Sequence, residues 1–509
     1  MKSEVILGER PLTIEDVAKV AFEKYPVMLS TDEGFKKRIQ LSQNFLQSLL
    51  DNKKEVYGVT TGYGDSCTTV VDEDLMAQLP ANLVRYHGCG LGDYFSEEES
   101  RAIQISRVAS LVRGVSGVSY ELLQFFVDQI NRGITPRIPK EGSVGASGDL
   151  TPLSYMAATA LGEGEVFYEN QTHKTSDLYK KLGIQAVGLK PKEGLAIMNG
   201  TAVMTALACL AFKRAEYLCQ FSSKITAANS LALMGNPHHF DELLFEAKPH
   251  KGQAQIAEWI RAAFSDEFIM SKRSRLQDRY SIRCAPHVIG VLQDGLYFFR
   301  TLIETELNSA NDNPLIDGEK ERIIHGGNFY GGHIAFAMDS MKVLIANVAD
   351  LLDRQFALLV DIKFNNGLPP NLSGATQKKS INHGLKALQI GTSAWTAEAL
   401  KLSLPASVFS RSTECHNQDK VSMGTISARD CIRALELTEQ VLAGTAIASA
   451  QALELRLRSG EISESMVGPS LMEFKNNIFK SIPFINEDRQ LDKDLRGLIS
   501  VIQKQEIQL

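Results

Sequence analysis

From about residue 196 onward, apolar side chains recur every three to four residues over long stretches of the chain. These stretches cover 196–234, 253–264, 288–310, 331–361, 384–403 and 426–458. This period puts the apolar side chains on one face of an α-helix, and helices of this length need neighbours that cover such a face. The pattern therefore predicts a mainly α fold, in which residues 196–509 form a bundle of long antiparallel helices.

Residues 1–195 follow a different pattern, in which short helical segments alternate with glycine-rich loops. The loops cover 57–65, 88–92, 141–149 and 162–169. Because glycine lets a backbone approach a ligand closely, loops of this kind are suitable places for a binding site. We therefore expect a smaller, loop-rich and mostly helical N-terminal domain over 1–195, and a central and C-terminal helical domain over 196–509.

Composition and charge exclude several classes of protein. The 54 Lys and Arg residues against 60 Asp and Glu residues give a formal charge of −6, which is unlike a nucleic-acid binder. The apolar stretch 196–212 contains Asn199, Thr201 and Thr205 and falls short of the roughly 20 apolar residues that span a membrane. The seven cysteines are scattered without a CxxC pair, which favours reduced thiols in a cytoplasmic protein and no metal site.

The most unusual peptide is Gly-Ser-Val-Gly-Ala-Ser-Gly-Asp-Leu-Thr-Pro-Leu-Ser, at residues 142–154. Its Ser-Gly-Asp before an apolar run is a good helix start, and the absence of a preceding strand and of a following lysine disfavours phosphate binding. The peptide resembles the signature of the aromatic amino acid ammonia-lyases and aminomutases. In that family the Ala-Ser-Gly tripeptide cyclises into 4-methylidene-imidazol-5-one (MIO), an electrophile. The resemblance implies that Ala146, Ser147 and Gly148 form this group, and that Ser147 loses its hydroxyl.

Six further blocks occur in the order of that family. They are Tyr57–Gly64, with Tyr63 in place of the usual Phe, then 193–201, 277–287, 309–317, 325–329 and 414–419. Seven ordered blocks cover nearly the whole chain, which most resembles a bacterial tyrosine ammonia-lyase. The resemblance implies a small aromatic amino acid as substrate, and a homotetramer whose active sites combine the Tyr57 and Tyr280 blocks of different chains.

The reaction of the family explains which side chains are needed. Ammonia is a poor leaving group and the β proton of the substrate is weakly acidic, so both steps need assistance. By resemblance, Tyr57 is the base, and its phenol needs a depressed pKa that positive charge or helix N-termini could supply. Arg283 corresponds to the arginine that binds the substrate carboxylate. The resemblance assigns contacts to the electrophile or substrate to Tyr280, Asn199, Gln277, Asn313, Phe329, Glu414 and Gln418.

Two positions bear on the choice of substrate. Tyr86 and His87 fall where the family contacts the ring of its substrate, and His87 can hydrogen-bond a phenol or an imidazole. An apolar ring would leave His87 unpaired, at a cost of about 1 to 3 kcal/mol. Histidine enzymes have Glu at the position of Gln418, whereas tyrosine and phenylalanine enzymes have Gln. L-Tyrosine, giving trans-4-coumarate, satisfies both positions; histidine, phenylalanine and an aminomutase remain alternatives, because Tyr86 departs from the pairings of the family.

A different class of function is a non-catalytic helical scaffold. Ala146, Ser147, Gly148, Tyr57 and Arg283 are all intact, and a chain without catalysis has no reason to keep them together. The mass of the purified chain separates the two hypotheses, because ring formation removes two water molecules.

Overall fold

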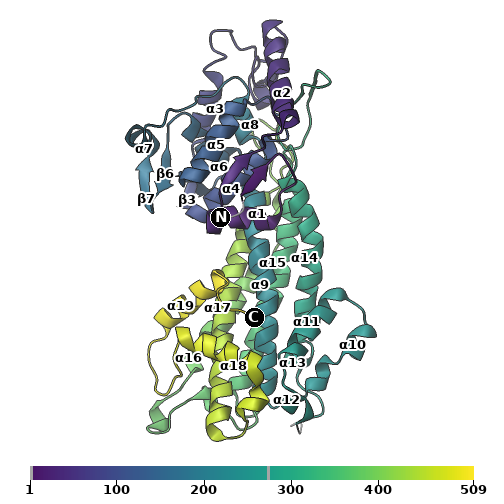
Figure 1. The fold of residues 1–509 in the computed structure, drawn as a ribbon, viewed down its shortest axis with the longest axis vertical. Coiled ribbons are helices and arrows are strands. Elements are labelled where there is room, and N and C mark those ends of the chain that lie inside the picture. The colour runs from purple at the N-terminus through teal and green to yellow at the C-terminus, as the bar shows by residue number, and fades with distance from the viewer. Residues whose placement is uncertain (1–3, 272–274) are drawn as a thin grey trace. The chain divides into compact units, whose positions relative to one another are not determined.

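The computed structural model of the protein describes residues 4–271 and 275–509. Helices dominate it, and the few strands are short, so the prediction of a mainly α fold with long helices is confirmed (Figure 1). The chain divides into two compact units, and each unit combines three stretches of the sequence. The first consists of Met1–Lys213, Phe299–Asp339 and Pro405–Arg429, and the second of Arg214–Phe298, Ser340–Leu404 and Asp430–Leu509. The predicted domain division near residue 195 stays a prediction.

The first unit contains most of the short elements. Its helices are α1 (Ile14–Glu23), α2 (Glu33–Asp51), α3 (Leu79–His87), α4 (Glu97–Leu111), α5 (Tyr120–Arg132), α6 (Leu150–Ala160), α7 (Thr175–Leu182) and α8 (Glu193–Met198), with 3-10 turns η1 (Gly64–Thr68) and η5 (Ser407–Phe409). Its strands are β1 (Val5–Leu7), β2 (Val27–Leu29), β3 (Leu91–Tyr94), β4 (Thr135–Pro136), β5 (Pro139–Glu141), β6 (Glu165–Tyr168), β7 (Gln171–Lys174), β8 (Leu315–Asp317) and β9 (Arg322–Ile324). The strands form small sheets in the orders β1-β2, β3-β5, β4-β6-β7 and β8-β9, of which only β1-β2 is parallel.

Four long helices contribute residues to both units, as the sequence pattern predicted for 196 onward. They are α9 (Ala202–Ala232), α14 (Ala285–Leu307), α15 (Gly332–Val360) and α17 (Gly424–Ser459). The second unit adds α10 (Glu242–Glu246), α11 (Lys251–Ala262), α12 (Asp266–Met270), α13 (Tyr280–Arg283), α16 (Lys386–Lys401), α18 (Glu464–Ser481) and α19 (Asp492–Gln503), with 3-10 turns η2 (Pro237–Phe240), η3 (Pro370–Leu372) and η4 (Lys379–Ile381). No helix within 4–271 and 275–509 is both long and apolar enough to cross a membrane.

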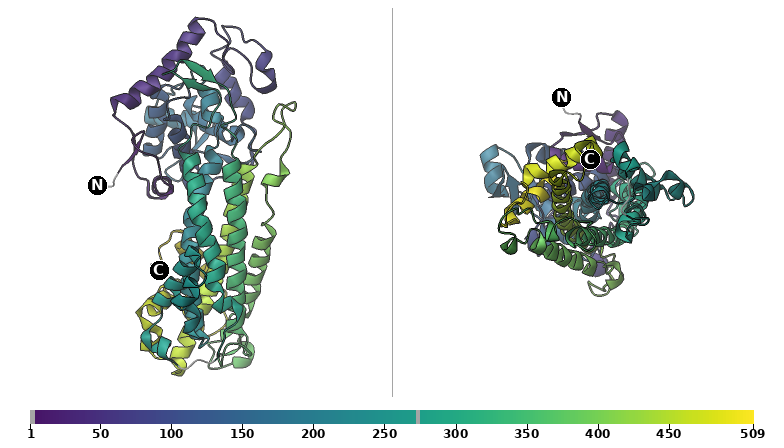
Figure 2. Two further views of the ribbon diagram at one scale, coloured as in Figure 1. Left: turned by 90° about the vertical axis from the view of Figure 1, so that its right-hand side faces the viewer. Right: turned by 90° about the horizontal axis from the view of Figure 1, so that it is seen from below.

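The bundle of the second unit combines two helix directions (Figure 2). Arg214 and Asn229 of α9 bond Glu439 and Ser449 of α17, so these two helices run parallel. Helix α16 runs against α17, because Glu398 of α16 pairs with Arg433 of α17 and Thr392 of α16 adjoins Gly444. The expected antiparallel arrangement therefore holds for some pairs only, since long connections rather than tight hairpins join the long helices.

A small apolar core fixes the turn that carries Tyr57. Val56 and Val59, on either side of it, are fully buried with Leu46 of α2 and Ile316 of β8. Because both flanking side chains point into this core, the short turn between them is held in place and the Tyr57 ring is directed away from the core.

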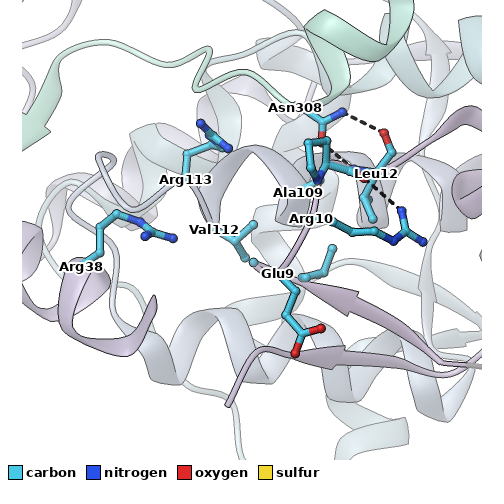
Figure 3. A pocket seen from close by; sticks show the side chains of 11 residues that line it. Glu9, Arg10, Leu12, Arg38, Ala109, Val112, Arg113 and Asn308 are labelled. Atoms are coloured by element: carbon cyan, nitrogen blue, oxygen red, sulfur yellow. Dashed lines mark hydrogen bonds between the residues drawn. The ribbon is translucent and has the colours of Figure 1, made fainter. Parts of the chain in front are cut away.

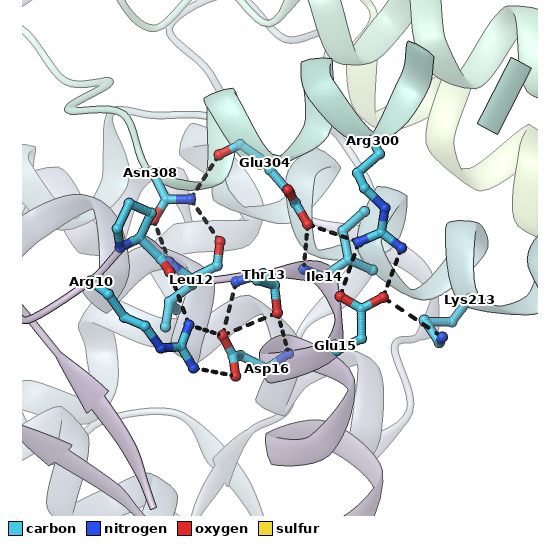
Figure 4. A network of polar contacts seen from close by, with 11 residues as sticks. Arg10, Leu12, Thr13, Ile14, Glu15, Asp16, Lys213, Arg300, Glu304 and Asn308 are labelled. Carbon is cyan, nitrogen blue, oxygen red and sulfur yellow. Dashed lines mark hydrogen bonds and ion pairs between the residues drawn. The ribbon is translucent and has the colours of Figure 1, made fainter. Parts of the chain in front are cut away.

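Polar contacts fix helix α1 to the end of α14 within the first unit (Figure 4). Arg300 pairs with Glu15 at 2.8 Å, and Asn308 bonds the backbone N–H and C=O of Leu12. Asp16 caps its own helix at Thr13 and also binds Arg10. These contacts hold the start of α1 against α14, beside the buried side chains of Leu12 and Ile14.

Candidate functional site

Two adjoining cavities of the first unit share six lining residues: Tyr57, Gly64, Ser147, Asn199, Asn417 and Gln418. Cavity A has a volume of about 400 Å³ and is also lined by Tyr63, Ser66, Leu83, Tyr86, His87, Leu150, Leu195 and Glu414. Cavity B has a volume of about 330 Å³ and is also lined by Cys67, Ala146, Asn313, His325, Phe329, Asp419 and Lys420. Because Ser147 and Tyr57 line both cavities, the two side chains border the same space.

Ten of the residues predicted from the sequence line these cavities: Tyr57, Tyr86, His87, Ala146, Ser147, Asn199, Asn313, Phe329, Glu414 and Gln418. Gly148 is buried directly behind Ser147. The remaining three, Gln277, Tyr280 and Arg283, belong to the second unit and are not among the lining residues.

The tripeptide 146–148 is held between two segments that are distant in sequence. On one side, Gly200 pairs with Gly148, donating its N–H to the Ser147 carbonyl and accepting from the Asp149 N–H at 2.7 Å. On the other side, Ser422 and Met423 donate to the carbonyls of Gly145 and Val144. Gly148 has φ +69°, and a Cβ at this position would collide with the Gly200 carbonyl. Only glycine therefore fits where the backbone is pressed together.

Three helices begin beside this loop. Helix α6 starts at Leu150, while the buried Asp149 carboxylate accepts the N–H groups of Val203 and Met204 in the first turn of α9. The same carboxylate bonds the Thr425 hydroxyl at the start of α17. Helix N-termini carry partial positive charge, so this arrangement favours negative charge near the loop. Burial raises the pKa of Asp149, and the hydrogen bonds from Thr425, Met204, Ser143 and Val203 oppose the increase.

Tyr57 lies with its phenol oxygen at the loop that follows it. The Gly64 N–H donates to this oxygen at 2.7 Å, and the Asp65 N–H donates to Glu414 Oε1 at 2.9 Å. The sequence predicted a depressed pKa for this phenol. Within the described residues the direction is opposite, because burial raises the pKa of Tyr57, and Glu414 and Cys67 raise it further against the effect of the Gly64 bond.

The geometry of His87 fixes which of its ring nitrogens carries a proton. Its Nδ1 lies 3.0 Å from the Leu83 carbonyl, which can only accept, so Nδ1 is the donor. Burial lowers the pKa of His87, which keeps the ring neutral and leaves Nε2 as an acceptor. The Tyr86 ring packs on it at 4.4 Å between centroids, and burial raises the pKa of Tyr86 to about 12. Cavity A therefore offers a neutral imidazole and a protonated phenol at this wall.

Amide side chains surround the tripeptide. Gln418 accepts from the Thr413 hydroxyl at 2.8 Å and donates through Nε2 to Ser147 Oγ at 3.3 Å. Asn199 donates weakly to the Asn313 carbonyl at 3.4 Å, while its buried Oδ1 has no partner among the described residues. An unpaired buried acceptor is costly unless a ligand supplies a donor, so Asn199 fits a site for an N–H or ammonium group.

The block around Tyr280 is open to solvent in the second unit. Tyr280 is 71% exposed although it is a large aromatic residue. The Arg283 guanidinium lies 4.5 Å over its ring and donates to the Asp278 carbonyl at 3.0 Å. Most of the donors of Arg283 are therefore available to an anion.

Some lining residues were missing from the sequence prediction. Tyr63, Leu195, His325 and Asn417 lie inside blocks that the sequence had already singled out, so position within a block was the available signal, and Leu83 lies one helical turn before His87. Ser66, Cys67 and Lys420 lie just beyond the blocks and carried no such signal.

Another hollow of the first unit is smaller and different in character (Figure 3). It encloses about 90 Å³ beside β1, between Glu9, Arg38 and Arg113. None of the residues predicted for the site lines it, and Arg10 at its edge is already paired with Asp16. The chemistry-bearing residues are therefore concentrated at cavities A and B.

Comparison with known proteins agrees with this arrangement. A family model described as aromatic amino acid lyase matches residues 12–474. The histidine ammonia-lyase of Caldanaerobacter subterraneus subsp. tengcongensis is 36% identical, over 100% of this chain and 98% of the relative. That of Bacillus subtilis is also 36% identical, over 99% of this chain and 97% of the relative.

Solved structures give the same result. The tyrosine aminomutase from Streptomyces globisporus superposes with a TM-score of 0.91 at 33% identity, covering 99% of this chain and 98% of the other. Histidine ammonia-lyase from Trypanosoma cruzi superposes with a TM-score of 0.89 at 28% identity, covering 99% and 94%. Family match, curated relatives and fold agree over nearly the full length, and the chain is therefore a carbon–nitrogen lyase that belongs to the aromatic amino acid lyase family.

Proposed function

We propose that this lyase eliminates ammonia from L-tyrosine to give trans-4-coumarate. The observation that carries the proposal is the lining of cavity A, where Gln418 and His87 occur together. Gln418 is uncharged, so it does not offer an imidazole substrate the negative charge that a Glu at this position would offer. The unprotonated Nε2 of His87 is a suitable acceptor for the phenolic hydroxyl of tyrosine.

The electrophile of this reaction is proposed to be MIO made from residues 146–148. The backbone at Gly148 supports this proposal, because its positive φ and the adjacent Gly200 carbonyl admit only glycine, the residue that ring closure requires at this position. Asn199 Oδ1 and Gln418 Nε2 are the side-chain groups that would hold the ring and an amine beside it. When formed, MIO supplies an electrophilic methylidene that turns the amine of the substrate into a better leaving group.

Tyr57 is proposed to remove the β proton. Its oxygen already accepts the Gly64 N–H, which stabilises the phenolate. Burial and Glu414 act in the opposite direction, so the base requires positive charge that arrives with the substrate or from another chain. Glu414, whose carboxylate lines cavity A, is proposed to contact the substrate ammonium.

Arg283, Tyr280 and Gln277 are proposed to complete the site from a neighbouring chain of a homotetramer. The exposed Tyr280 ring and the available donors of Arg283 support this proposal, since they suit groups that a second copy covers. Arg283 would bind the substrate carboxylate in a bidentate manner. Asn313 and Phe329 would line the far side, next to cavity B.

Histidine deamination is the second candidate, because histidine ammonia-lyases are the curated relatives at 36% identity. An imidazole N–H could also bond His87 Nε2. The similarity to a tyrosine aminomutase adds a third outcome, in which ammonia returns to the product before release.

Product analysis with tyrosine, histidine and phenylalanine in competition tests the proposal. We expect coumarate and ammonia as the main products, and an intact mass reduced by two water molecules. Urocanate as the main product would replace the proposal by histidine deamination, and β-tyrosine would replace it by the mutase outcome. An unmodified mass together with no product would contradict the assignment of the electrophile.

A further inference from the structure

Tyr63 occupies the place in the Thr-Gly-x-Gly block where the resemblance places Phe. The Tyr63 side chain lines cavity A. Its ring packs against Gly58, where the absence of a Cβ leaves room for the ring. The only difference between Tyr and Phe is a hydroxyl group, so the substitution matters only through what that hydroxyl bonds.

The Tyr63 side chain lines cavity A, and its hydroxyl, which is not fully buried, has no hydrogen-bond partner among the residues that the structure describes. By contrast, the phenol oxygens of Tyr57, Tyr155 and Tyr179 in this unit have backbone or amide partners. Burial and the neighbouring phenols of Tyr86 and Tyr57 raise the pKa of Tyr63. The group therefore stays an O–H donor that faces the cavity without an acceptor.

Two neighbouring side chains supply further hydrogen-bonding groups to cavity A. Tyr86 contributes a second phenol to the same cavity, and His87 contributes the acceptor Nε2. A hydroxyl on a bound ring could donate to His87 and accept from a tyrosine at the same time. An unsubstituted ring could do neither, and would leave the Tyr63 hydroxyl and His87 Nε2 without a partner on the ligand.

We propose that Tyr63 is a specificity-determining residue, which donates a hydrogen bond to a hydroxyl on the aromatic ring of the substrate. The inference rests on the proposed function of this site. It goes further because it assigns the discrimination between substrates to Tyr63, which the sequence did not predict as a site residue. It limits the substrate class to aromatic amino acids whose rings carry a hydrogen-bond acceptor. Tyr63 contacts the ring rather than the reacting atoms, so it affects binding more than chemistry.

The test compares Tyr63→Phe with Tyr168→Phe, which removes a phenol of β6 away from both cavities. Binding of 4-coumarate and of cinnamate, which differ by one ring hydroxyl, is measured by calorimetry for each full-length protein. We expect Tyr63→Phe to reduce the preference for 4-coumarate by at least about tenfold, while the Tyr168 variant keeps the parent preference. Both variants should keep the mass loss of two water molecules, which shows that the loop has folded.

For turnover of tyrosine, the Tyr63 variant should raise KM with a smaller change in kcat. A preference within about twofold of the parent would overturn the inference, even if the parent deaminates tyrosine. A parent that ignores tyrosine but binds 4-coumarate through Tyr63 would instead contradict the proposed function and leave this residue assignment standing. The two failures are therefore distinguishable.

Discussion

Two polar regions of the first unit adjoin the segment from Lys192 to Asn199 and differ in how their groups are paired. In the rear region, Lys192 and Asp312 are fully buried and paired at 2.6 Å, and Arg107 donates to the Asn199 carbonyl. In the front region, which lines the cavities, Asn199 Oδ1 is buried without a partner among the described residues, and the Tyr63 hydroxyl bonds none of them either. Pairing makes the rear region a rigid support, whereas the unpaired groups in front are those that a ligand can satisfy. Changes behind should therefore lower stability, and changes in front should lower activity.

The largest expected effect is in the front region. Ser147→Ala removes the hydroxyl that must leave for MIO to form, and we expect turnover to fall more than about a thousandfold. The melting temperature should stay near that of the parent, because one small hydroxyl at a cavity is lost. Intact mass and steady-state kinetics measure both effects. Ser154→Ala in α6 is the matched control, and Ser147→Ala activity within tenfold of the parent would refute the electrophile.

Tyr57→Phe should leave the modified mass unchanged and remove proton abstraction. We expect kcat to fall by about a hundredfold to ten-thousandfold, the usual contribution of a general base. Tyr120→Phe in α5 provides the control for loss of a phenol elsewhere. Normal turnover of the Tyr57 variant would exclude it as the base.

Lys192→Met tests the rear region. Removing one partner leaves Asp312 buried without its cation, which should lower the free energy of unfolding by about 3 to 5 kcal/mol. Lys53→Met breaks an exposed pair with Glu73, and should leave the free energy of unfolding close to that of the parent. Urea titration measures both variants. Equal losses in the free energy of unfolding would show that burial of an ion pair does not change the cost of breaking it.

His87→Phe should change selectivity rather than stability. The variant loses the Nε2 acceptor, and the ratio of kcat/KM for tyrosine over phenylalanine should fall by at least about tenfold. His173→Phe in β7 is the control. An unchanged ratio would make His87 structural, held only by its bond to Leu83.

The smallest effect concerns the Glu15 contact to α14. The Arg300 hydrogen bond lowers the pKa of Glu15 to about 2, from an unfolded value of about 4.5. Its stabilisation is therefore present above about pH 4.5, and is lost as the pH falls toward about 2. Glu15→Gln should flatten this part of the acid-unfolding curve, by less than about 1 kcal/mol because the pair is partly exposed.

Sequence predicted the front region better than the rear. Tyr57, Asn199 and Gln418 lie in short blocks whose residue types follow from the chemistry, and these blocks meet in one space. Lys192 and Asp312 are 120 positions apart, and nothing in either local pattern indicates that they pair. The direction of the Tyr57 pKa was also beyond local reasoning, because it depends on burial and on Glu414 from a distant loop.

The helix pattern had a similar limit. Periodicity gave the long helices and their approximate extents, since it depends only on neighbouring residues. It could not give their relative directions, and α9 and α17 proved parallel because the connections between them are long. Similarly, the residue types of the Tyr280 block identified it in the sequence. The exposure of Tyr280 could not be predicted in this way, because it depends on how the whole chain folds.

The loop at 146–148 is closed from one side by residues much later in the chain. Ser422 bonds Gly145 from 277 positions away, and Thr425 bonds Asp149 from 276 positions away. During synthesis these contacts cannot form until residue 425 has been made. Ring closure that depends on this compression would be a late event in the life of the molecule. A mass lower by two water molecules would then show that these distant segments had docked in that molecule.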